Sequence, residues 1–94
     1  PPGLPNILRD DTATFLDLDM AVLGAGPADY DAYEAGIATE YVPVHGLDAF
    51  RVGRAAFLRA MLGRGRLFHT ERFHCRLDAA ARANLQRGLR NLAG

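Results

Sequence analysis

The chain has 94 residues, of which 49 % are hydrophobic, and its formal net charge is zero. This length suits one domain or part of one, and the apolar content favours a packed chain over a disordered one. No apolar run approaches the roughly 20 residues of a membrane helix, and no charged-then-apolar leader opens the chain. Because the first residue is Pro rather than Met, we expect the chain to begin inside a longer gene product. Cys75 is the single cysteine, so no internal disulfide is required and we expect a cytoplasmic protein.

The charges are segregated along the chain. Residues 1–48 carry one Arg and nine acids, a balance of −8, whereas residues 49–94 carry ten Arg and two acids, a balance of +8. Two interpretations are open: the halves pack against each other, or the Arg-rich half binds phosphate, which the guanidinium fork matches. We favour packing, because interspersed Ala and Leu place these Arg on the outer faces of helices.

The N-terminal segment, residues 1–6, holds three prolines, so we expect a linker or loop there and helices over 7–94. The first helix is expected to start at Asp10 or Asp11, whose carboxylates suit a helix N-terminus. Gly24 is expected to end it. Four apolar residues of this helix recur at helical spacing: Phe15, Leu16, Met20 and Leu23. Of these, Met20 and Leu23 should face the core.

The second predicted helix starts near Pro27 and ends at Pro43. Three tyrosines fall along one stripe of it: Tyr30, Tyr33 and Tyr41. Such a stripe can be a stacking platform for bases, but the interleaved acids would repel a nucleic acid. We therefore interpret the tyrosines as an edge of the core whose hydroxyls reach the surface, and we disfavour nucleic acid as a partner.

A third helix is predicted after Gly46 with Asp48 as its cap, and the glycines and arginines of residues 63–66 should break it. Thr70 is predicted to cap a short helical turn ending at Phe73. The last helix should run from about Leu77 to Leu92 with four inward positions: Ala81, Leu85, Leu89 and Leu92. No segment alternates as a strand does. The sequence thus predicts an all-α bundle of four main helices plus a short helical turn, as a single domain or fragment over 1–94.

Five short blocks, in order, carry a resemblance to a known family. The first is Phe15-Leu16-Asp17-Leu18-Asp19-Met20-Ala21-Val22-Leu23-Gly24. The others are Tyr30-Asp31-Ala32-Tyr33 with Glu40-Tyr41, Phe50-Arg51-Val52-Gly53-Arg54, Leu67-Phe68-His69-Thr70 with Phe73, and Ala81-Arg82-Ala83-Asn84-Leu85. Together they resemble the C-terminal half of bacterial proteins described as predicted metal-dependent HD-superfamily phosphohydrolases, the first block matching a D-x-D-L-x-x-L-G pattern.

The resemblance implies phosphoester hydrolysis at a metal centre on a larger HD-type helical domain. Its ligands would be an upstream His, a His-Asp pair and a more distant Asp, and a divalent Mn, Fe, Zn or Mg ion would activate water. Because this sequence has no His-Asp pair, it can supply only the last ligand, which we assign to Asp19 with Asp17 as the alternative. The two acids lie about 200° apart on a helix, so only one can face a metal.

Alone, the chain is therefore expected to have no catalytic residues and no activity. The partners that the resemblance implies are the upstream half of the same protein and a phosphorylated small molecule or nucleotide. Arg51 and Arg54 are candidates for the substrate phosphate, although either could instead pair with acids, Arg54 with the acidic helix. His69 and His74 miss the spacing of paired metal ligands, so we expect surface or capping histidines. Cys75 is expected to be a small buried residue.

The alternative function is a non-catalytic helical module for interaction or oligomerisation, in which the acidic and basic halves pair within or between copies of the chain. A homo-oligomer would follow from pairing between copies. Substrate identity is beyond the sequence under either hypothesis.

Overall fold

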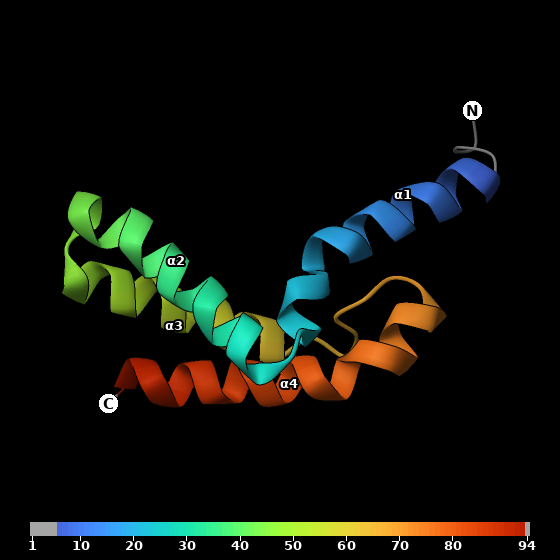
Figure 1. Ribbon diagram of the computed structural model, residues 1–94. Coiled ribbons are helices and arrows are strands. Elements are labelled where there is room, and N and C mark those ends of the chain that lie inside the picture. The colour runs from blue at the N-terminus through green and yellow to red at the C-terminus, as the bar shows by residue number, and fades with distance from the viewer. Residues whose placement is uncertain (1–5, 94) are drawn as a thin grey trace.

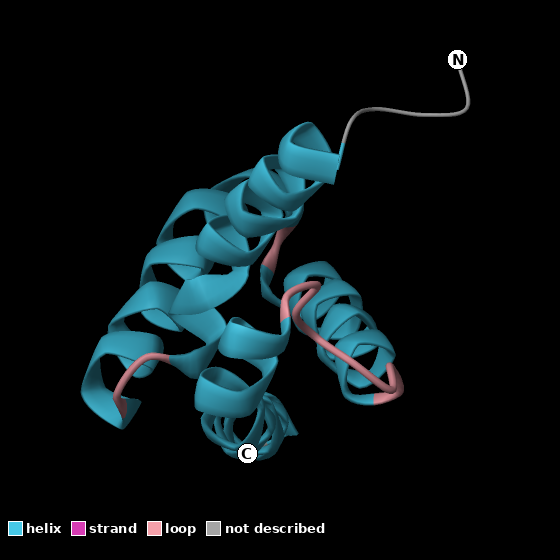
Figure 2. Ribbon diagram, turned by 90° about the vertical axis from the view of Figure 1, so that its right-hand side faces the viewer, coloured by secondary structure: helices cyan, strands magenta, loops and turns pink. Residues whose placement is uncertain are grey.

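The computed structural model describes the backbone of residues 6–93 and the side chains of residues 12–93. No strand occurs among the described residues, which confirms the all-α prediction (Figure 2). Residues 1–5 of the predicted linker lie outside the described residues. Four helices and one short 3-10 helix follow in chain order: α1 (Asn6–Met20), η1 (Ala21–Gly24), α2 (Pro27–His45), α3 (Leu47–Leu62) and α4 (Glu71–Ala93).

The helices form a bundle from which α1 projects (Figure 1). Helices α2 and α3 make an antiparallel hairpin, and α4 runs along both of them and also packs against η1. Helix α1 meets the rest of the molecule near its C-terminal end, mainly through η1. Between residues 6 and 93, no helix is long and apolar enough to cross a membrane.

The boundaries of the first two helices depart from prediction at three points. Helix α1 begins at Asn6, before the predicted caps Asp10 and Asp11, and its α-helical part ends at Met20, with η1 continuing to Gly24. Helix α2 begins at Pro27 as predicted, but it does not end at Pro43. A proline in the last turn removes only one backbone donor, so the helix continues to His45, and the N–H of the next residue, Gly46, donates to the Val42 carbonyl at 2.8 Å.

The turn between α2 and α3 depends on Gly46. Its φ of +87° lies in the region that glycine alone adopts without steric cost, so this residue lets two long helices reverse direction without an intervening loop. Asp48 lies in the first turn of α3, where its charge suits the positive helix end, although it is not the cap that the sequence predicts.

The C-terminal helix is longer than predicted. Thr70 does act as a cap, since its Oγ1 accepts a hydrogen bond from the Phe73 N–H at 3.3 Å. The short turn and the last helix, however, are one continuous helix, so the predicted separate helical turn is wrong. Nothing between Phe73 and Leu77 removes a backbone donor or requires an unusual φ, and a helix capped at Thr70 therefore continues.

The core lies where α2, α3, α4, η1 and the loop before α4 meet. Met20 and Leu23 face this core as predicted, whereas Phe15 and Leu16 from the same apolar pattern are 70 % and 44 % exposed. All four inward positions predicted for α4 contact the core. The buried hydrophobic residues are Leu23, Tyr30, Leu58, Met61, Leu67, Phe68, Ala81 and Leu85.

The acidic and basic halves of the chain face each other inside one molecule. The Arg87 Nη2 on α4 lies 2.9 Å from the Asp31 Oδ1 on α2, and the Arg54 guanidinium on α3 pairs with Glu34 on α2. Both ion pairs join an acid of the first half to an Arg of the second. This is the arrangement that the packing interpretation of the segregated charges predicts.

Candidate functional site

Asp17 connects the projecting helix α1 to the N-terminus of α4. Its side chain is fully buried, and its Oδ1 accepts a hydrogen bond from the His69 N–H at 2.5 Å. Its Oδ2 accepts two more, from the Thr70 N–H at 2.8 Å and from the Thr70 hydroxyl at 2.6 Å. Asp17 thus binds the segment that caps α4, close to the positive end of that helix.

The surroundings of Asp17 favour its ionised form. Burial opposes ionisation, but the hydrogen bonds from the Thr70 hydroxyl and from the His69 and Thr70 amides outweigh that cost and lower the pKa of the Asp17 carboxyl. Both carboxylate oxygens are occupied by donors of the protein. Asp17, the alternative metal ligand, is therefore an intramolecular acceptor in this structure.

Asp19 has the opposite surroundings. It lies on an exposed part of α1, and none of the residues in the described part of the chain donates to its carboxylate. Its neighbours Phe15 and Leu18 are apolar, yet they are 70 % and 54 % exposed. The structure therefore places one acid of the D-x-D block inside the molecule and leaves the other on an apolar, uncovered surface.

A complete metal site is not present among the described residues. No group of three or more His, Cys, Asp or Glu side chains within residues 12–93 could hold a metal ion. Asp19 alone offers one donor, whereas a catalytic metal usually takes about three protein ligands. The described residues thus do not make up a whole metal centre.

The histidines and the cysteine near the start of α4 do not converge. His69 is exposed and acts through its backbone amide, and the His74 Nδ1 lies 3.8 Å from the Asp78 Oδ1. Cys75 is exposed, so the prediction that it is buried is wrong. The hydrogen bond that its thiol donates to the Glu71 carboxylate raises the pKa of Cys75 and keeps the thiol protonated.

Arg54 is engaged within the molecule. Its Nε and Nη2 donate to the two carboxylate oxygens of Glu34, at 3.1 and 2.5 Å, and Glu34 also accepts from the Tyr30 hydroxyl at 2.8 Å. The guanidinium carbon lies 4.7 Å from the Phe57 ring centroid. Of the two alternatives for Arg54, the acidic helix and a substrate phosphate, the structure shows its side chain paired with the acidic helix. Arg51, the other phosphate candidate, is exposed on α3.

Replacing Glu34 with Gln is expected to lower the free energy of unfolding by about 1–3 kcal/mol, because the Arg54 side chain is only 11 % exposed and would lose its counter-charge. Glu40→Gln is the matched control on the same helix, since Glu40 is exposed, and we expect it to change stability by less than about 0.5 kcal/mol. Urea unfolding followed by circular dichroism measures both. Equal stabilities of the two variants would contradict the importance of this pair.

Two polar residues of α4 hold neighbouring segments of the chain through hydrogen bonds, and the sequence analysis did not predict this role. Asn84 is buried, and its Nδ2 donates to the carbonyls of Leu23 and Ala25 at 2.8 Å each. Arg82 donates from Nη1 to the Leu62 carbonyl at 3.1 Å, and so completes the C-terminal end of α3. Both lie within the fifth block of the resemblance. Local spacing reveals the pairing of Arg82 with Asp78 on α4, but it does not reveal the carbonyls of Leu62, Leu23 and Ala25, which lie far away in the sequence.

The tyrosine stripe is divided by its surroundings. Tyr30 is fully buried with its hydroxyl bound to Glu34, so the expectation that its hydroxyl reaches the surface is wrong. Tyr33 packs against the core as expected, whereas Tyr41 is 48 % exposed and does not belong to the described residues that pack against the core. Comparison with protein-family models, with curated proteins and with solved structures finds no match to this chain.

Proposed function

We propose that this chain is the C-terminal helical portion of a metal-dependent HD-superfamily phosphohydrolase, in which Asp19 is the last metal ligand. The proposal starts from the resemblance of the five sequence blocks, and the all-α fold is compatible with it. The other ligands, a His and a His-Asp pair, would come from the upstream half of the same protein. The substrate would be a phosphorylated small molecule or a nucleotide, and the location cytoplasmic.

The observation that supports the assignment of Asp19 is the difference in hydrogen bonding between Asp17 and Asp19. Asp17 has both oxygens bound by donors of the loop directly before α4, whereas Asp19 has no partner in the described part of the chain. An unbound carboxylate among exposed apolar side chains suits a surface that another part of the protein covers. A metal bound there would polarise the phosphoryl oxygen and activate water.

The role of this chain's own residues is then to hold one carboxylate in place. Asp17 fixes the C-terminal part of α1 to the start of α4, and Asn84 fixes η1, the next segment. Asp19 lies between these two anchors. Arg51 remains a candidate for the substrate phosphate, whereas Arg54 already gives two of its donor groups to Glu34.

Asp19→Asn in the polypeptide that joins this chain to its upstream half is expected to lower metal affinity by roughly tenfold or more, because a neutral amide is a weaker ligand than a carboxylate. Inductively coupled plasma mass spectrometry of the purified protein measures the metal content. Asp29→Asn is the matched control, since Asp29 is an exposed acid on α2. Unchanged metal content in Asp19→Asn, with normal content in the control, would remove Asp19 from the site.

The alternative is a non-catalytic helical module that associates through its exposed apolar surface. Its supporting observation is that several large apolar side chains are uncovered, including Phe15, Val44 and Val52, each at least 70 % exposed. The ion pairs across the acidic and basic halves are formed within one chain, which favours apolar contact over charge pairing between copies. Sedimentation velocity at low and high salt distinguishes the two modes, because only charge pairing weakens strongly with salt.

A further inference from the structure

The outer face of α3 is apolar although it is exposed to solvent. Because successive residues of a helix lie about 100° apart, six positions of α3 share one arc of about 140° that contains no polar side chain. These positions are Ala49, Val52, Gly53, Ala56, Phe57 and Ala60. All six are exposed, Val52 by 72 % and Phe57 by 39 %. Solvent-facing helix surfaces usually carry charged and polar residues, so this face has the composition of a covered one.

The exposed faces of the two neighbouring helices differ from this face. Helix α2 presents acids to solvent, among them Asp29 and Glu40, and α4 presents arginines, among them Arg76 and Arg90. The apolar outer face is therefore a property of α3 and does not follow from the composition of the chain as a whole.

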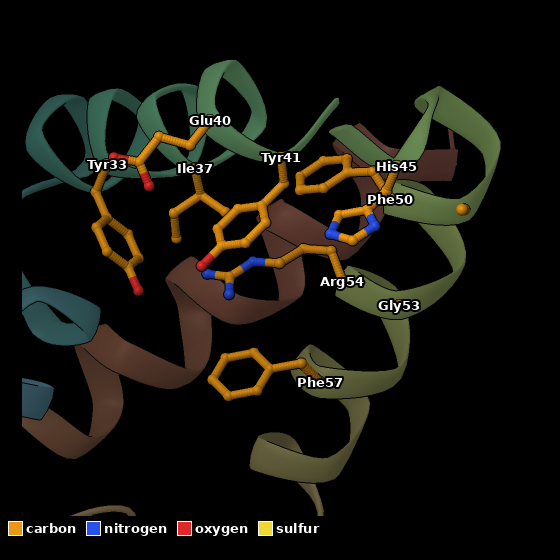
Figure 3. Close-up of a pocket in the computed structure, with 10 residues that line it drawn as sticks. Tyr33, Ile37, Glu40, Tyr41, His45, Phe50, Gly53, Arg54 and Phe57 are labelled. Atoms are coloured by element: carbon orange, nitrogen blue, oxygen red, sulfur yellow. The ribbon is translucent and has the colours of Figure 1, made fainter. Parts of the chain in front are cut away.

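The hollow beside this face is occupied by the chain itself. A pocket of about 630 Å³ lies between α2 and α3, and Gly53 and Phe57 line it from α3. In Figure 3, the Arg54 side chain extends between the rings of Tyr41 and Phe57. The Arg54 guanidinium carbon lies 4.7 Å from the Phe57 ring centroid. A partner therefore contacts the outer face as a surface and does not insert into the pocket.

Two opposite charges border one edge of the apolar face, and neither has a partner within residues 12–93. Asp48 lies in the first turn of α3 and Arg59 in its last turn, and no described residue binds either side chain. Because they are separated by about three turns, the two residues lie about 20° apart around the helix and about 16 Å apart along it. That distance excludes an ion pair between Asp48 and Arg59 of the same helix.

We propose that the apolar face of α3 binds the same face of a second copy of the chain, with the two α3 helices antiparallel. The two-fold axis of such a pair keeps each edge of the face on its own side, so Asp48 of each copy lies level with Arg59 of the other. In a parallel pair each residue lies level with itself, and neither charge is matched. Apolar contact supplies the buried area, and the two ion pairs fix direction and register.

The position of the axis agrees with the shape of the face. The midpoint between Asp48 and Arg59 falls next to Gly53, within the apolar face. Gly53 has no side chain, and a Cβ added there would meet no atom within 4 Å. The helices can therefore approach closely where they cross.

This inference does not rest on the phosphohydrolase proposal, because neither α1 nor Asp19 takes part in the contact and its test needs no metal. The exposed apolar residues of α1 are a poorer surface for pairing between copies. Residues 12–20 carry acids and no Arg, so two copies of that face offer each other no opposite charges.

Sedimentation equilibrium of the 94-residue chain tests the proposal, and we expect a reversible monomer–dimer equilibrium. Asp48→Arg brings Arg opposite Arg at two places in the dimer, and Arg59→Asp brings Asp opposite Asp. Each should weaken the dimer by roughly tenfold or more. The double variant restores opposite charges, and its Kd should return to within about threefold of that of the unmodified chain. A folding defect cannot produce this rescue, because the double variant carries both changes.

Asp29→Arg and Arg90→Asp are the matched controls. Asp29 is an exposed acid in the first turn of α2, as Asp48 is in the first turn of α3. Arg90 is an exposed arginine in the last turn of α4, as Arg59 is in the last turn of α3. Both controls make the same change of charge outside the apolar face, so we expect them to leave the Kd within about twofold.

Ala56→Arg places a charge in the middle of the apolar face and should weaken the dimer by at least about a hundredfold. Ala83→Arg makes the same change at an exposed alanine of α4 and should leave the dimer intact. A chain that stays monomeric at all concentrations, or a dimer that persists in Ala56→Arg, would overturn the face as the site. Loss of the dimer in both single-charge variants without rescue in the double variant would overturn the antiparallel arrangement.

Discussion

Asp17→Ala is expected to lower the free energy of unfolding by about 3–5 kcal/mol, a large part of the stability of a chain of this size. The substitution removes the acceptor of three hydrogen bonds and leaves the amides of His69 and Thr70 without their partner. These donors lie in the loop directly before α4, where no preceding helical turn offers them an acceptor. The cost is high because Asp17 is fully buried and water does not readily replace it.

Urea unfolding monitored by circular dichroism measures this effect. Asp19→Ala is the matched control, because it removes a carboxylate from the same helix two residues further on, at an exposed position. We expect the control to change stability by less than about 0.5 kcal/mol. Alanine is a better helix former than aspartate, so a loss of similar size in both variants would mean that the hydrogen bonds from His69 and Thr70 to Asp17 do not determine the result.

The contribution of Asp17 also depends on pH. Its carboxyl has a lowered pKa in the folded chain, so the stabilisation is fully present above the ordinary pKa of an unfolded Asp, about 3.9. The stabilisation is lost as the pH falls through the lower, folded-state pKa. The stability difference between the unmodified chain and Asp17→Ala should therefore be constant near neutral pH and should shrink below about pH 4.

The two acids of α1 show what the sequence predicts and where prediction ends. Helical geometry predicts that Asp17 and Asp19 point in different directions, and the structure agrees. Which of them is buried depends on amide groups 52 and 53 residues further along the chain. No local pattern contains that information, because a hydrogen-bond partner on another element leaves no periodic trace in the sequence.

Features that depend on neighbouring residues were predicted better. The start of α2 at Pro27 and the cap at Thr70 follow from local backbone chemistry, and both are confirmed. The end of α2 was predicted wrongly at Pro43, because the cost of one missing donor in a last turn is small beside the contacts of a continuing helix. Pairing of Arg54 with the acidic helix was one of two alternatives that the sequence left open, and its partner Glu34 was not predicted.

The candidate site, too, could be predicted from the sequence only in part. The D-x-D block is visible in the sequence, and so is the apolar residue Phe15 beside it. Periodicity assigns Phe15 to an apolar face but does not say what covers that face, and within the described residues it is 70 % exposed. A pocket lined by residues of α2 and α3 was not predicted at all, since the placement of one helix against another leaves no local pattern in the sequence.

Asn84→Leu is expected to lower the free energy of unfolding by about 2–4 kcal/mol, although leucine has a similar volume and is a better helix former. Asn84 is 2 % exposed and donates from Nδ2 to the carbonyls of Leu23 and Ala25, both at 2.8 Å. Its Oδ1 also accepts a hydrogen bond from Arg87 at 2.9 Å. Leucine fills the space but supplies no donor, so two carbonyls at the end of η1 lose their partner in a buried place.

Asn91→Leu separates this loss from a change in helix propensity, because Asn91 lies on the same helix at an exposed position. If the hydrogen bonds to η1 matter, urea unfolding should place Asn84→Leu well below Asn91→Leu in stability. Amide exchange should also accelerate over residues 21–25 more than over the last turns of α4, because η1 is the segment that loses its anchor. Equal stability and unchanged exchange would mean that the packing of Leu23 alone holds η1, and with it the end of α1, against α4.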